Sequence, residues 1–138
     1  MAVIEFKNLP DTSTPVNANN LNSMQQDIYS TSEIKTNKVW TDNKPIYRKV
    51  ISTNTPSTAD TTSRIGYLGI PIDTLVKLES YIQMTSTVWV PNPQYLAGTI
   101  YNYIYLQSCD TISEIIMSVK ANNYTSVPIN IVVEYTKP

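Results

Sequence analysis

From residue 39 onward, large side chains recur at every second position, the spacing that places them on one face of a β-strand. The strand-like runs are separated by turn-favouring residues such as Pro91-Asn92-Pro93 and Asn122-Asn123. Residues 52–63 contain almost nothing to bury, and we expect a loop there. The pattern predicts strands over residues 44–51, 65–70, 76–84, 87–90, 99–107, 112–120 and 127–137.

The clearest alternation lies in residues 99–107. One face of this run carries Ile100, Asn102, Ile104 and Leu106, and the other carries Tyr101, Tyr103 and Tyr105. Because both faces are large, we expect a strand inside a sheet, with the aliphatic face in the core and the tyrosines toward a second surface. The last run alternates in the same way and begins at Pro128, a position that suits the start of a strand.

Seven or so short strands, with almost no helical period after residue 38, are typical of a mainly β fold. The helices that a parallel sheet needs between its strands are missing from the pattern. We therefore predict an antiparallel β-sandwich, jelly-roll-like, over residues 39–138.

Residues 1–38 follow a different pattern and predict an attachment segment. Pro10 and Pro15 restrict the backbone, so the start reads as an extended arm. After Asn17, a good helix N-cap, Leu21, Met24 and Ile28 share one face of a short helix among polar neighbours. So narrow an apolar stripe needs a partner: its own domain, sister chains in a short bundle, or a larger assembly. The residues that would make such a contact, whether by attachment to an assembly or by trimerisation with sister chains, are Phe6, Leu9, Pro10, Leu21, Met24 and Ile28.

The composition suits strands and turns better than catalysis. The 138 residues include 17 Thr, 13 Ser and 13 Asn, whereas only 15% are charged, against roughly 25% in an average soluble domain. The chain has no histidine, one cysteine and three glycines. Histidine-based triads, histidine or multi-cysteine metal sites, P-loops and dinucleotide fingerprints are therefore excluded, and we expect no cofactor.

Charge and hydropathy exclude further partners. A net charge of −1, with only ten Lys and Arg residues, does not indicate a positively charged surface for nucleic acid. No apolar run is long enough to span a bilayer, and residues 1–10 lack the basic start and apolar core of a signal peptide, so we expect synthesis in a cytosol.

A glycosidase built on two carboxylates needs no histidine, so the acidic residues require a test. The eleven Asp and Glu residues are scattered singly, without a DxD or ExE pair. We therefore expect no enzyme activity, and we interpret the acids as residues of the surface and of turns.

Aromatic side chains are the remaining candidates for function. The rings and hydroxyls of Tyr101, Tyr103 and Tyr105 would suit a saccharide platform, although packing on a second sheet or a neighbouring subunit would produce the same ladder. For Trp40 and Trp89 a place in the core is the simpler interpretation, and Trp89 is kept as a possible contact. Tyr95 follows a proline-rich turn, so we expect it to be exposed on a loop.

Two stretches of the chain resemble one family. Residues 6–28, FKNLPDTSTPVNANNLNSMQQDI, are similar to an NLPDTSTPxNAxNLN segment near the start of fibre, baseplate and neck-associated proteins of tailed bacteriophages. Residues 39–51, VWTDNKPIYRKVI, and the ending VEYTK at 133–137 resemble the WxDGKPIYRKVI…EYTK frame of a small C-terminal β domain in the same proteins. Two positions depart from this pattern. Asn43 replaces the usual turn glycine, which is tolerable because asparagine also adopts left-handed backbone, and Asn20 stands where relatives often have an acid.

The resemblance implies a virion structural protein, usually trimeric, whose N-terminal segment docks on the particle while the β domain projects outward. We expect a fibre or spike-like subunit of a head or tail fibre that is made in the cytoplasm of the host bacterium. Its expected partners are itself, other virion proteins and host cell-surface polysaccharide. The alternative is a head or neck decoration or connector protein with no receptor.

Overall fold

The computed structural model describes residues 29–92, 94–96, 99–108, 111–120 and 122–138. This part of the chain is mainly β, and every described strand pair is antiparallel, which confirms the predicted class. No helix within it is long and apolar enough to cross a membrane. The residues assigned to attachment and trimerisation lie outside the described part: Phe6, Leu9, Pro10, Leu21, Met24 and Ile28.

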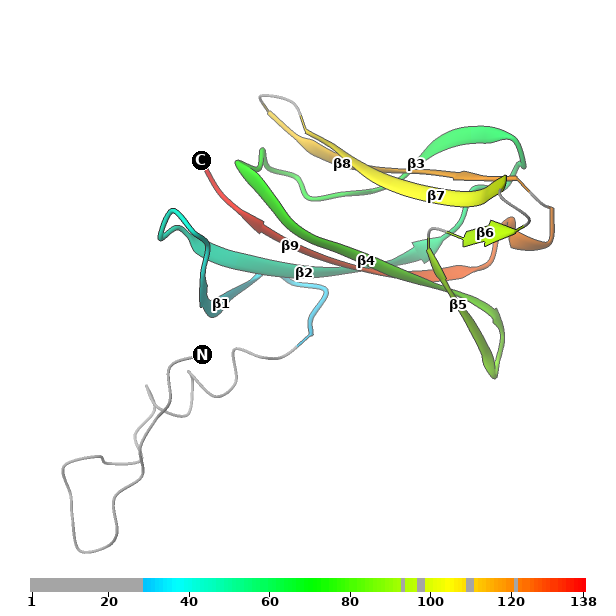
Figure 1. The fold of residues 1–138 in the computed structure, drawn as a ribbon, viewed down its shortest axis with the longest axis horizontal. Coiled ribbons are helices and arrows are strands. Elements are labelled where there is room, and N and C mark those ends of the chain that lie inside the picture. Colours follow the sequence, from blue (N-terminus) through cyan, green and yellow to red (C-terminus); the bar gives the residue numbers. More distant parts are fainter. Residues whose placement is uncertain (1–28, 93, 97–98, 109–110, 121) are drawn as a thin grey trace, which may run out of the picture.

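Five strands form the first sheet, in the order β1-β2-β9-β4-β5 (Figure 1). Their bounds are β1 Ile34–Val39, β2 Pro45–Asn54, β9 Pro128–Thr136, β4 Thr74–Thr85 and β5 Val88–Asn92. The first strand thus spans the expected domain boundary between residues 38 and 39. In the turn before β2, Asn43 has a φ of 65°, so the asparagine adopts the left-handed backbone that we expected it to tolerate.

Four strands form the second sheet, in the order β3-β8-β7-β6, and this sheet covers one face of the first as a separate layer (Figure 1). Their bounds are β3 Thr61–Tyr67, β8 Ser113–Val119, β7 Thr99–Ser108 and β6 Gln94–Leu96. A short 3-10 turn, Asn122–Tyr124, leads into β9. The flanking strands β8 and β6 confirm that residues 99–107 lie inside a sheet.

Three sequence expectations need correction. The strand expected over residues 65–70 instead spans Thr61–Tyr67. The loop expected over residues 52–63 is shorter, because β2 continues to Asn54 and Thr61–Ser63 already pair with β8. Tyr95 belongs to a strand and not to a loop, because Gln94–Leu96 pair with β7 and Tyr95 lies opposite Ile100.

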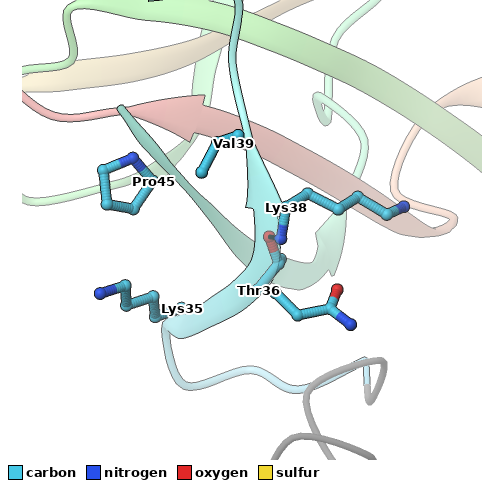
Figure 2. Close-up of a pocket in the computed structure, with 6 residues that line it drawn as sticks. Lys35, Thr36, Lys38, Val39 and Pro45 are labelled. Atoms are coloured by element: carbon cyan, nitrogen blue, oxygen red, sulfur yellow. Dashed lines mark hydrogen bonds between the residues drawn. The ribbon is translucent and has the colours of Figure 1, made fainter. Parts of the chain in front are cut away.

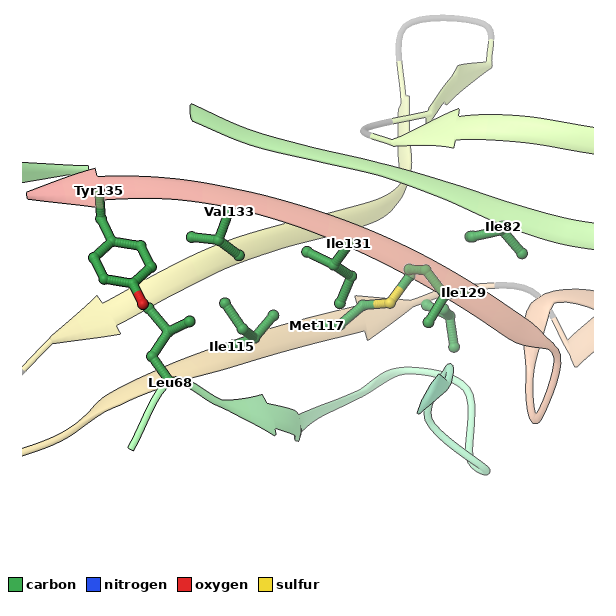
Figure 3. Packing of buried hydrophobic residues seen from close by; sticks show 9 residues of the cluster. Leu68, Ile82, Ile115, Met117, Ile129, Ile131, Val133 and Tyr135 are labelled. Atoms are coloured by element: carbon green, nitrogen blue, oxygen red, sulfur yellow. The ribbon is translucent and has the colours of Figure 1, made fainter. Parts of the chain in front are cut away.

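The core lies between the two sheets, and β9 supplies its central row. Alternate side chains of this strand point inward and are almost completely buried. They meet inward-facing residues of β8 and β4 (Figure 3). The labelled core comprises Leu68, Ile82, Ile115, Met117, Ile129, Ile131, Val133 and Tyr135. Burial of these side chains is the main favourable term that holds the sheets together.

The outer face of the five-stranded sheet carries a buried ion pair. Nε and Nη2 of Arg48, on β2, both lie 2.7 Å from Oε1 of Glu134, on β9. The guanidinium also lies 4.6 Å from the ring centroid of Tyr29, in the usual range for a cation–π contact. The carbonyl of Ser30 accepts a hydrogen bond from the Val50 amide. The chain just before β1 is therefore fastened along β2.

A second polar cluster fastens the same segment from the inner side. Tyr135 and Lys137 both donate hydrogen bonds to the Glu33 carboxylate, and Lys137 Nζ lies 4.2 Å from the Tyr47 ring centroid. Burial opposes ionisation of Glu33, but the hydrogen bonds from Lys137 and Tyr135 outweigh it and lower the pKa of this carboxyl. Burial, followed by the bond to Glu33, raises the pKa of the Tyr135 phenol.

The buried pair predicts an asymmetric response to mutation. Replacing Glu134 by Leu leaves the Arg48 charge buried without its partner, which we expect to lower the free energy of unfolding by about 3–5 kcal/mol. The double variant Arg48→Met/Glu134→Leu should recover most of this loss, because no charge then stays buried. Urea unfolding of both variants measures the difference. A loss below about 1 kcal/mol in the single variant would show that water already solvates the pair.

The Glu33 cluster predicts a loss of stability in acid. Because the folded-state pKa of Glu33 is lowered, its contribution is complete above the unfolded-state value near 4.5 and disappears as the pH falls through the folded-state value. We expect Glu33→Gln to lower the free energy of unfolding by about 1–2 kcal/mol at pH 7, and by less at pH 3. Denaturant melts at both pH values test this. An equal loss at pH 3 and pH 7 would contradict the role of the ionised carboxylate.

Candidate functional site

The tyrosines of β7 lie on the outer face of the four-stranded sheet. Ile104 and Leu106 pack against the core, so the alternate positions point away from it, as the sequence predicts. Tyr103 and Tyr105 stack with ring centroids 6.2 Å apart and an interplanar angle of 17°. Tyr105 is 40% exposed. An aromatic surface is therefore open to solvent at this point of the sheet.

Two neighbouring strands fix the position of these rings. Across β8, Tyr103 lies opposite Ser118 and Tyr105 lies opposite the buried Ile116. The Tyr103 hydroxyl also reaches Thr62 of β3, at 3.4 Å. Hydrogen bonds with Thr62 and then Ser118 lower the pKa of the Tyr103 phenol. The Tyr103 side chain thus extends across β8, and its hydroxyl lies near those of Thr62 and Ser118.

A charged cluster borders the stacked tyrosines on β3. Nε of Arg64 lies 2.8 Å from Glu114 Oε1, and Nη1 donates a 2.9 Å hydrogen bond to the Tyr67 hydroxyl. The guanidinium carbon lies 5.2 Å from the Tyr67 ring centroid. Tyr67 is 49% exposed. We call this outer surface the tyrosine face, and it comprises Thr62, Arg64, Tyr67, Tyr103 and Tyr105.

A β-bulge brings Arg64 and Tyr67 to the same face. Arg64 pairs with Ile116, but Gly66 pairs with the next residue, Ile115, so Ile65 is the extra residue of β3. Residues 64 and 67 therefore both point outward, although a regular strand would direct them to opposite faces. A Cβ at Gly66 would lie 3.0 Å from Ile51 Cγ2, so glycine also lets the two sheets approach closely at this point.

The structure separates the other aromatic candidates. Trp89 lies on β5 of the five-stranded sheet, away from the tyrosine ladder, and is 46% exposed. The interpretation of Trp89 as a core residue is therefore wrong, because it alternates with the inward-facing Val90. Tyr95 and Tyr101 belong to β6 and β7, but their side chains lie outside the part that the structure describes.

Sequence analysis missed three exposed residues: Arg64, Tyr67 and Tyr81. The available signal for the first two was Gly66, because an isolated glycine in a strand-like run indicates a bulge. Tyr81 is 44% exposed on the outer face of β4, between the buried Ser80 and Ile82. The residues that lie beside Tyr81 follow only from the pairing register of β4 with β9 and β5.

A shallow hollow of about 360 Å³ runs along β1, lined by Lys35, Thr36, Asn37, Lys38, Val39 and Pro45 (Figure 2). Lys35 and Lys38 extend to opposite sides of the strand in this view. The Thr36 hydroxyl is occupied by a 2.8 Å hydrogen bond to the Ile46 carbonyl. Neither an acid nor an aromatic ring lines this hollow, so the tyrosine face has the richer chemistry for binding.

The described residues contain no group of three or more His, Cys, Asp or Glu side chains placed to hold a metal ion. Known protein families, curated proteins and solved structures gave no match to this chain. What the tyrosine face offers is aromatic surface, neutral hydroxyls and one guanidinium. These groups suit reversible contact with a hydroxyl-rich ligand.

Proposed function

We propose that this protein is a structural component of a bacteriophage virion, a fibre or spike-like subunit whose β-sandwich adheres to carbohydrate on the host cell surface. The tyrosine face is the proposed contact. The N-terminal segment joins other virion proteins and starts a homotrimer. The resemblance of residues 6–28, 39–51 and 133–137 to phage fibre, baseplate and neck-associated proteins supports the virion assignment.

The stacking of Tyr103 on the exposed Tyr105 is the observation that carries the adhesion proposal. Aromatic rings bind the apolar sides of sugars, while nearby hydroxyls exchange hydrogen bonds with sugar hydroxyls. Thr62 and Tyr67 supply such hydroxyls around the rings. Their positions are set by strands of one sheet, so little ordering is needed when a ligand binds.

The direction in which the chain enters the domain supports outward display. Tyr29 lies over Arg48 on the outer side of the five-stranded sheet, whereas the tyrosine face is the outer side of the other sheet. The attachment segment would therefore approach the end of the five-stranded sheet that carries Arg48 and leave the tyrosine face, on the other sheet, clear of the attachment point. Several linked copies would multiply a weak contact into useful avidity.

The jelly-roll-like description belongs to the same proposal. Two stretches of chain each pass from one sheet to the other: β2 is followed by β3, and β8 is followed by β9. These stretches pair with each other in both sheets, because β2 pairs with β9 in the first sheet and β3 pairs with β8 in the second. Paired ribbons of this kind are a feature of jelly rolls, which are common in viral proteins.

A head or neck decoration or connector protein is the second candidate. The exposure of Tyr67 and Tyr105 would favour it equally if a neighbouring virion protein packed on them. The two candidates differ in whether the free protein binds carbohydrate.

We predict that Tyr105→Ala weakens binding to bacterial cell-wall polysaccharide by about tenfold, because it removes an exposed ring worth about 1–1.5 kcal/mol. A glycan array, followed by titration calorimetry with the best polysaccharide, measures this. Val39→Ala is the matched control, since Val39 is an exposed residue on β1 of the other sheet. Binding that is unchanged in Tyr105→Ala contradicts the tyrosine face, and no binding by the unmodified protein favours the decoration or connector candidate.

A further inference from the structure

The outer face of the five-stranded sheet is divided into a charged end and an uncharged end. Matched cross-strand positions form rows across the sheet, and one row contains Arg48, Glu134 and Lys77. Tyr29 covers the arginine of this row. The next row contains Val50, Val132 and Glu79. Beyond it, no outer residue of the described rows carries a charge.

The uncharged end is a four-strand surface with two exposed aromatic rings. One row runs from Ser52 through Asn130 and Tyr81 to Pro91, and Gln83 and Trp89 form the adjacent pair on β4 and β5. We call these six residues the neutral face. Tyr81 and Trp89 are diagonal neighbours across β4 and β5. Such neighbours are about 7–8 Å apart, close enough for one ligand to meet both rings.

The polar groups of the neutral face are already oriented. Ser52 donates a 2.7 Å hydrogen bond to Asn130 Oδ1, which directs the amide N–H groups of Asn130 away from Ser52. The Tyr81 hydroxyl donates a 3.2 Å hydrogen bond to Glu79 and keeps its oxygen as an acceptor. Donors and acceptors thus stand beside the exposed rings. Tyr81 and Trp89 are 44% and 46% exposed, so both rings are open to solvent.

We propose that the neutral face is a second carbohydrate site, specific for an uncharged saccharide. It shares the ligand class of the proposed function but uses none of the residues of the tyrosine face. Stacking on Trp89 and Tyr81 would hold the apolar sides of sugar rings, and Asn130, Gln83 and Ser52 would bind their hydroxyls. A ligand without charge fits because none of the six residues is ionic, and the neighbouring Glu79 is already paired with Lys77.

The chemistry favours a saccharide over a second copy of this chain. The centre of a protein–protein interface is apolar and tightly packed. The row of the neutral face that contains Tyr81 instead includes the hydroxyl of Ser52 and the amide of Asn130, both on exposed residues. Pro91 on β5 also lacks the N–H that would extend the sheet into a neighbouring copy.

The two tryptophans of the chain provide a direct test. The variant Trp40→Phe leaves Trp89 as the single tryptophan, so its fluorescence reports only on the neutral face. We would titrate this full-length variant with soluble glucan, mannan and galactan, and with a polyuronate as the charged comparison. The expected result is a saturable emission shift with at least one neutral polysaccharide and none with the polyuronate.

Substitutions on the neutral face connect the shift to affinity. Trp89→Ala and Tyr81→Ala should each weaken calorimetric binding of that polysaccharide by about tenfold or more, whereas Leu75→Ala, an exposed control at the far end of β4, should not. The absence of an emission shift with all three neutral polysaccharides overturns the proposal, and so does a shift with the polyuronate alone. A shift that follows protein concentration without sugar, with a matching change in light scattering, overturns it in favour of a second copy.

Tyr105→Ala in the Trp40→Phe background separates the two proposed sites. A Trp89 shift that survives this substitution supports the neutral face on its own, even if the tyrosine face fails its test. Loss of the Trp89 response in that variant overturns an independent second site. Carbohydrate binding that depends on Tyr105 and leaves Trp89 unchanged also overturns it, while the proposed function stands.

Discussion

The burial of one side of β9 is the constraint on which both sheets depend. Ile129, Ile131, Val133 and Tyr135 fill the layer between the sheets and are almost inaccessible to water. The opposite side of the same strand carries polar residues, including Asn130 and Glu134. Because strand side chains alternate, a shift of one residue in register would exchange these two sets. The apolar row thereby also determines which polar groups stand on the outer surface.

The single buried layer leaves two outer faces with different chemistry. On the four-stranded sheet, hydroxyls and an ion pair surround stacked tyrosines. On the five-stranded sheet, the Arg48–Glu134 pair is buried at one end, and the other end is neutral and exposed. Tyr29, Ser30 and Glu33 fasten the start of the described chain beside the charged end. The contacts that fasten residues 29–33 thus lie at the opposite end of this sheet from the neutral face.

Local alternation predicted the parts of this structure that depend on neighbouring residues. The orientation of Tyr103 and Tyr105 follows from a period of two, and it agrees with the structure. Arg48 and Glu134 are 86 residues apart in sequence. The alternation of side chains within one strand does not show which strands become neighbours, so it could not predict this pair. The bulge at Ile65 likewise shifts by one position the residues of β3 that point outward. Both candidate faces therefore contain residues, Tyr67 and Tyr81 among them, that only the sheet register reveals.

The low charge of this chain has a consequence for how any adhesion must operate. Without a strong field, neither long-range steering nor counterion release contributes much to binding. Flat, rigid faces of rings, hydroxyls and amides give weak individual contacts, because each exposed group exchanges water for ligand at a small net gain. Linked sites compensate, since a second contact then forms at an effective concentration in the millimolar range. Two faces on one sandwich, repeated over several copies, would convert such contacts into durable attachment that changes little with salt.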